Sequence, residues 1–264
     1  MKVRSSLVGT ISPETDGRTA RVPVPFIEGS FVMKLLPCVL SVIAGSADII
    51  SFLGLNGLFA AHITGNLILI AARIVNGSAV GFAHLLSVPV FILALGLTRL
   101  LVAGLDAAGI TSLRPLLVLQ FLLLAGSLTL GVAGPPVAAD AAQAIFAGML
   151  GVSAMAVQNA LVQISLKGAP STAVMTTNIT RFMMDVGEVL LVKNSKEAAQ
   201  ARRRAQQTWP AIVGFIVGAG LGAVCFGAVG MWSLALPTGL ALLAVATGLA
   251  PPKINATQTS SQSA

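Results

Sequence analysis

The sequence predicts an all-α fold: a polytopic membrane helix bundle of six to eight transmembrane segments built as two internal repeats. Of its 264 residues, 55% are hydrophobic and only 9% are charged, whereas soluble proteins carry about 25% charged residues. The apolar residues come in blocks of about 20, the length that a helix needs to cross a hydrocarbon core of roughly 30 Å. A polar motif also occurs twice. Together these observations exclude a soluble domain.

The apolar blocks are expected to be helices, because backbone polar groups inside lipid must be satisfied within the segment. Eight helices are predicted, at residues 34–54, 58–76, 79–105, 113–133, 137–166, 171–193, 208–230 and 231–250. They divide into a first membrane repeat, 34–133, and a second, 134–250. A flexible cytoplasmic arm at 1–33 and a disordered polar tail at 251–264 are expected to flank them.

The net charge of +7 is concentrated in the N-terminal arm and in one predicted loop, residues 193–207. That loop holds Lys193, Lys196, Arg202, Arg203 and Arg204 against Glu197. The positive-inside rule places such a loop in the cytoplasm, together with the N-terminus. The positive-inside rule therefore explains the net positive charge without a nucleic-acid partner. An alternative role for the same loop is a patch that binds anionic lipid headgroups.

The repeated motif reads AHITGN at residues 61–66 and AVMTTN at residues 173–178. When the halves are aligned, the following pairs match: Asp48 with Asn159, Gly57 with Gly168, Thr64 with Thr176, and Asn66 with Asn178. One inserted residue separates the second pair from the third. Such repeats are typical of secondary transporters, whose binding sites lie near the membrane midplane between the repeats.

The sequence is compatible with two topologies. If segments 58–76 and 171–193 cross the membrane, the chain has eight spans and parallel halves. If both re-enter instead, six spans remain and the halves are inverted. Both topologies keep 193–207 in the cytoplasm, but only the six-span topology also places Gly109 there.

Four stretches of the sequence carry a family resemblance: AGSADIISFL, FAAHITGNLILIA, MAVQNAL and STAVMTTNITRF. Together they resemble the YoaK-type family of bacterial integral membrane proteins, a domain of unknown function. The resemblance covers about residues 35–250. It implies a multi-pass location in the bacterial inner membrane. It implies no activity, substrate or catalytic residue.

Charged side chains inside the apolar segments are the first candidates for a site, since each costs about 2.5–3.5 kcal/mol at a helix centre. Asp48 lies deep in its helix, a position typical of a proton-coupling group or a cation ligand. In segment 171–193, polar and charged side chains recur every three or four residues and so share one helix face: Asn178, Arg181, Asp185 and Glu188. Arg181 and Asp185 are expected to form an ion pair, either in a transport pathway or as a structural lock.

The polar residues of the two motifs are the second candidates. His62 is expected to be an interhelical hydrogen-bonding partner, because His84 is the only other histidine and no metal-ligand pattern occurs. Asn66 and Asn178 are expected to bond across the repeat interface. No metal or cofactor is expected.

Gly214, Gly218 and Gly222 form a GxxxGxxxG pattern, which allows another helix to approach closely. That helix belongs either to the same chain or to a second copy in a homodimer. No phosphate-binding loop, hydrolase motif or metalloprotease motif occurs, which disfavours an enzyme.

The leading hypothesis is a small-solute transporter, a permease or exporter with proton coupling as one option. The substrate or ion pathway is predicted to include Asp48, His62, Thr64, Asn66, Asn159, Thr176, Asn178, Arg181 and Asp185. The alternatives are a non-transporting membrane interaction or assembly protein, in which these residues only lock helices together, and an intramembrane enzyme.

Overall fold

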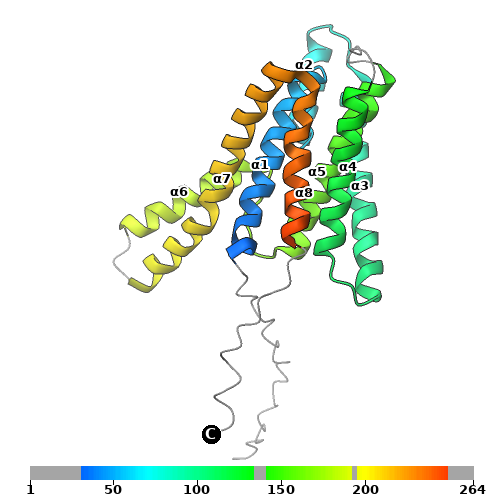
Figure 1. The fold of residues 1–264 in the computed structure, drawn as a ribbon. Helices are drawn as coiled ribbons and strands as arrows, with labels where there is room; N and C mark the ends of the chain where they lie inside the picture. The colour runs from blue at the N-terminus through cyan, green and yellow to red at the C-terminus, as the bar shows by residue number, and fades with distance from the viewer. Residues whose placement is uncertain (1–30, 134–140, 192–194, 249–264) are drawn as a thin grey trace, which may run out of the picture.

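A computed structural model describes residues 31–133, 141–191 and 195–248, all of them helical or in connecting turns (Figure 1). The helices are α1 (Phe31–Gly54), α2 (Ile63–Val75), α3 (Phe82–Ala107), α4 (Leu113–Val132), α5 (Ala142–Ser165), α6 (Met175–Leu191), α7 (Ser195–Val229), the 3-10 helix η1 (Gly230–Leu234) and α8 (Ala235–Gly248). The expected arm and tail lie outside the described residues, apart from residues 31–33, which already belong to α1.

Five stretches of the described residues are long and apolar enough to cross a membrane: Leu35–Gly54, Phe82–Ala107, Leu113–Val132, Ala142–Ser165 and Lys196–Thr247. The last folds back on itself at η1, so that α7 and α8 form two antiparallel legs (Figure 1). Large apolar side chains such as Ile92, Leu97 and Leu100 of α3 are exposed on the outside of the bundle. Such a surface suits lipid and not water, and the chain is a multi-pass helical membrane protein.

Two of the helices start inside the bundle. The chain leaves α1, turns at Asn56 and Gly57, both with positive φ, and returns along α1 before α2 begins. We call residues 55–62 the first returning segment. The chain leaves α5 in the same way, turns at Gly168 with φ +87°, and returns over residues 166–174, the second returning segment. With 13 residues, α2 is only about 20 Å long and too short to cross a bilayer.

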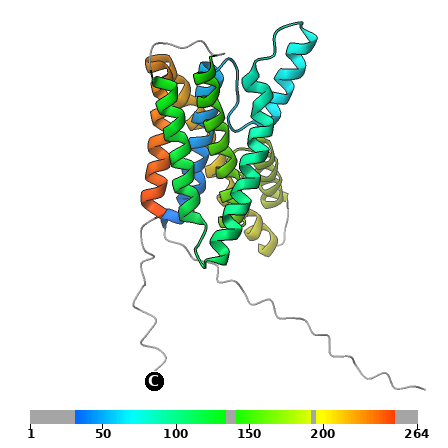
Figure 2. The same ribbon diagram turned by 90° about the vertical axis from the view of Figure 1, so that its right-hand side faces the viewer.

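The two returning segments enter from opposite ends of the bundle, because α1 and α5 are antiparallel. Gln158, late in α5, donates a hydrogen bond to the carbonyl of Leu40, early in α1. Gly148, early in α5, lies against Leu55 and Leu58, just beyond the end of α1. Figure 2 shows the first segment dipping into the bundle before α2 rises again beside α3. This geometry favours the six-span topology over eight spans.

The glycine-rich face of α7 packs on α1. A Cβ atom at Gly214 would lie 2.7 Å from the carbonyl oxygen of Cys38, and one at Gly218 would collide with the backbone of Val42. The helices run parallel, since higher residues of α7 meet higher residues of α1. The glycine pattern therefore serves contact within one chain, and its interpretation as a homodimer seam is wrong, because α1 already covers it.

The basic stretch 195–207, expected as a loop, is helical and forms the first turns of α7. The 35 residues of α7 extend about 52 Å, well beyond the thickness of a hydrocarbon core. In Figure 1 this part of α7 leans away from the bundle with α6 alongside it. Residues 193 and 194 lie outside the described residues.

A candidate polar site at the returning segments

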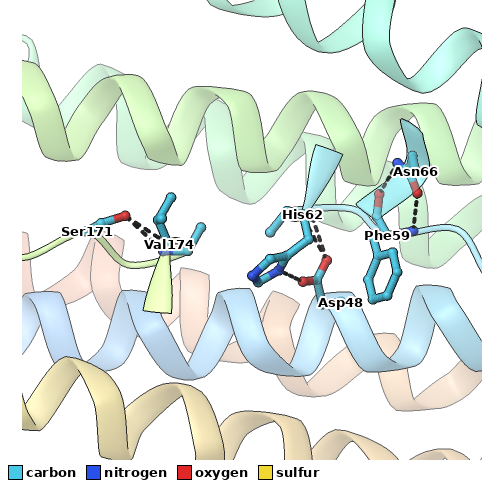
Figure 3. Close-up of polar contacts among 8 residues, drawn as sticks. Asp48, Phe59, His62, Asn66, Ser171 and Val174 are labelled. Atoms are coloured by element: carbon cyan, nitrogen blue, oxygen red, sulfur yellow. Dashed lines mark hydrogen bonds and ion pairs between the residues drawn. The ribbon is translucent and has the colours of Figure 1, made fainter. Parts of the chain in front are cut away.

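Asp48 holds the first returning segment in place. It is 4% exposed, and its Oδ1 accepts hydrogen bonds from the backbone N–H groups of Ala61 at 2.6 Å and His62 at 3.4 Å. Its Oδ2 bonds to Nδ1 of His62 (Figure 3). Buried backbone N–H groups outside a helix need acceptors from elsewhere in the fold. A carboxylate from α1 thus supplies acceptors for Ala61 and His62, the last two residues of the returning segment before α2 begins.

His62 precedes α2 and is half-buried beside Asp48. A carboxylate can only accept, so the contact places the ring proton on Nδ1 and leaves Nε2 as the second nitrogen of the ring. The rings of Phe59 and Phe215 meet the imidazole edge-on, at centroid distances of 6.2 and 5.5 Å. In the view of Figure 3 the imidazole points along α1 in the direction of Ser171 and Val174. Asp48 thus fixes the ring and leaves Nε2 able to exchange a proton.

Asn66 and Asn178 each bind their own returning segment, seven residues back along the chain. Asn66 forms a reciprocal pair with Phe59: Nδ2 donates to the carbonyl oxygen at 2.8 Å, and Oδ1 accepts from the backbone N–H at 2.9 Å. Asn178 donates from Nδ2 to the carbonyl of Ser171 at 2.6 Å. These bonds therefore run within each half and not across an interface between halves. The spacing is the same in both.

A chain of buried amides holds the second returning segment. Gln158 of α5 donates from Nε2 to Thr172 Oγ1 and to the carbonyl of Leu40, both at 2.9 Å. Its Oε1 accepts a hydrogen bond of 2.7 Å from Nε2 of Gln120 in α4. Three helices and the returning segment are thereby joined. Sequence reasoning missed these residues, although a glutamine inside an apolar block is itself a signal of an interhelical bond.

Two buried amide oxygens near the second segment accept no hydrogen bond from the described residues: Oε1 of Gln120 and Oδ1 of Asn178. Their orientations follow from their partners, since each amide nitrogen faces an oxygen acceptor. A buried acceptor without a donor costs about 1–3 kcal/mol. The first half differs at Asn66, whose Oδ1 accepts from the N–H of Phe59.

The expected ion pair between Arg181 and Asp185 is corrected by the structure. Asp185 pairs with Arg204 of α7 at 2.7 Å, and Arg204 also reaches Glu188 at 2.7 Å. Arg181 is exposed. As predicted, Asp185 and Glu188 lie on one face of α6, but their cationic partner is Arg204, from the basic stretch of α7. This cluster joins α6 to α7 and is separate from the contacts of Asp48.

The other predicted pathway residues are less enclosed. Thr64 and Thr176 are exposed, and Asn159 is half-buried beside Gln158. Within the described ranges, no three His, Cys, Asp or Glu side chains are grouped so that they could hold a metal ion. Of the predicted residues, the structure brings Asp48 and His62 together, and it holds Asn66 and Asn178 each against its own returning segment.

Antiparallel legs, returning segments and buried polar anchors define a multi-pass helical membrane protein. A family model described as "Protein of unknown function (DUF1275)" matches residues 36–247. The chain belongs to this family, which agrees with the resemblance to YoaK-type proteins. A comparison with curated proteins finds no match. A comparison with solved structures finds none either.

Proposed function

We propose that this protein moves a small solute across the bacterial inner membrane, through a polar region between the two returning segments. The observation that carries the proposal is a pair of helices that start inside the bundle, each preceded by a segment held by buried polar groups. Non-helical backbone at membrane depth is tolerated only where it is buried in protein or lines a cavity. In secondary transporters, interrupted helices of this kind present backbone groups to the substrate.

The two halves are proposed to be inverted repeats. Three features support this: Gly57 and Gly168 share φ +87°, Asn66 and Asn178 each bond seven residues back, and α1 and α5 are antiparallel. Substrate sites at repeat interfaces are open to alternating access when one half moves against the other. The unpaired oxygens of Gln120 and Asn178 would be acceptors for a donor on the solute or for water.

The proposed proton-coupling step involves His62. With Nδ1–H directed at Asp48, Nε2 can take a proton from one side and release it toward the other as the site changes access. In this scheme the carboxylate of Asp48 faces the ring and holds its orientation. The sequence offered Asp48 as a proton-coupling group or a cation ligand, and this proposal instead places the exchanging proton on the imidazole of His62.

Replacing Asp48 by asparagine tests this role. The amide oxygen of the new side chain can still accept from Ala61 N–H, whereas its amide nitrogen is a donor and would force the proton of His62 onto Nε2. The variant is expected to fold and insert but to lose proton-linked flux. The measurement uses proteoliposomes loaded with a pH-sensitive dye and challenged with amino acids, small carboxylates, sugars and amines.

The matched control is Asp106→Asn, which removes an exposed carboxylate from the end of α3. It is expected to keep the wild-type response, while Asp48→Asn falls to the level of empty liposomes. Unchanged flux in Asp48→Asn combined with a lower unfolding temperature would instead support the helix-locking alternative, in which the polar residues serve assembly only.

The orientation is also proposed. Five basic residues lie toward the end of the bundle where α5 ends and α7 begins: Arg114, Lys167, Arg202, Arg203 and Arg204. The positive-inside rule assigns that end, and with it the N-terminus, to the cytoplasm.

A reporter pair tests both the orientation and the six-span topology. Gly109 and Gly77 lie in turns with positive φ, and an added Cβ meets nothing within 4 Å at either. Alkaline phosphatase is expected to be inactive at Gly109 and active at Gly77, and a fluorescent protein should show the reverse. An eight-span chain with a cytoplasmic N-terminus would exchange the two results.

A further inference from the structure

The α6–α7 hairpin carries an apolar groove on its outer surface. The groove has a volume of about 190 Å³ and is lined by Phe182, Val186, Val189 and Leu190 of α6 and by Arg202, Ala205, Gln206 and Trp209 of α7. Since Arg202, Ala205 and Trp209 are three and four residues apart, they share one face of α7. The groove is therefore a strip with apolar walls that runs along both helices.

The two ends of the groove differ in character. Trp209 is 48% exposed and comes directly before the apolar part of α7. Tryptophan is enriched at the level of the lipid headgroups. Arg202 lies two turns earlier, about 10 Å further along α7 and away from its apolar part. The groove thus runs from Trp209, a residue typical of the membrane interface, to the cation of Arg202.

The charge at Arg202 is not neutralised within the described part of the chain. Arg204 binds both Asp185 and Glu188, which uses the two carboxylates that α6 directs at α7. Arg202 and Arg203 are exposed and have no acidic partner among the described residues. An anionic group of small size is the natural complement of such an arginine, which can bind phosphate through two parallel hydrogen bonds.

We propose that this groove binds one anionic phospholipid, with its phosphate on Arg202 and an acyl chain along Phe182, Val186 and Trp209. The order of the parts matches a lipid, because the cation is at the outer end and the apolar walls lead toward the bilayer. The site is separate from the returning segments, and it does not depend on whether the protein transports a solute.

Tryptophan quenching tests the site, because the chain has only two tryptophans, Trp209 and Trp232. Trp232 lies in η1 at the far end of α7 and is also exposed. The full chain carrying Trp232→Phe is placed in phosphatidylcholine bilayers that contain a minor fraction of brominated phosphatidylglycerol or brominated phosphatidylcholine. Trp209 is expected to show about fivefold enrichment of the anionic lipid, the factor that corresponds to about 1 kcal/mol.

Arg202→Gln in this background is expected to remove the preference, whereas Arg203→Gln, an equal loss of charge at the same depth outside the groove, should keep it. The chain carrying Trp209→Phe, which reports from Trp232, should show no preference. Equal quenching by both lipids, or equal loss in the two arginine variants, would overturn the proposal. So would quenching that disappears when the protein concentration is raised, which would indicate a second copy of the chain in the groove.

Discussion

Replacing Gly218 by valine is expected to destabilise the folded protein strongly. A Cβ atom at this position would collide with the backbone carbonyl of Val42 and approach its Cα to 2.8 Å. Backbone atoms of a helix cannot move aside as a flexible side chain can, so α7 must separate from α1 along the whole contact. The cost is expected to be about 3 kcal/mol or more. Thermal unfolding in detergent, followed by size-exclusion chromatography, measures it.

Gly220→Val is the matched control. Gly220 lies on the same helix, two residues on, and an added Cβ meets nothing within 4 Å. The control variant is expected to elute and melt like the wild type, because valine in that position faces outward. If both variants behaved alike, the close approach of α1 and α7 would not be needed for the fold.

Replacing Gln158 by leucine is expected to release the second returning segment. The change removes the acceptor for Gln120 Nε2 and the donor to Thr172 Oγ1, so that two buried polar groups lose their partner. At about 1–3 kcal/mol for each buried group, the loss of stability is expected to reach about 2 kcal/mol or more. Hydrogen exchange should become faster at residues 169–174, while residues 58–62 keep their protection.

Gln163→Leu provides the comparison, since Gln163 is an exposed glutamine on the same helix. It is expected to leave both the unfolding temperature and the exchange of residues 169–174 unchanged. Uniformly faster exchange in the Gln158 variant would mean that the amide chain stabilises the whole bundle and not this segment in particular.

The long helices were predictable from the sequence because length and hydropathy alone decide which segments cross a bilayer. The starts of α2 and α6 were not. Leu58, Ala60 and Ala61 are buried yet not helical, and hydropathy reports burial without distinguishing a helix from an extended segment packed in a bundle. The two glycines Gly57 and Gly168 were the better signal, since a turn with positive φ favours glycine.

The sequence indicated which polar residues take part in buried contacts, but not which of them pair with each other. Asp48 and His62 were both singled out, but their contact depends on a turn that brings residues 14 positions apart together. Arg204 was assigned to a loop and was not considered as a partner for Asp185. Spacing along a helix identifies neighbours on the same helix, and it cannot rank them against a cation on another helix.

The contact of α1 with α7 also has a consequence for biosynthesis. Gly45 of α1 meets the backbone of Phe215, which is 170 positions later in the chain (215 − 45). Likewise, Leu40 accepts its hydrogen bond from Gln158, in the other half. Because synthesis proceeds from the N-terminus at about 5–20 residues per second, α1 waits in the membrane for roughly ten seconds or more before its neighbour emerges. The first half therefore reaches its final packing only after most of the second has been made.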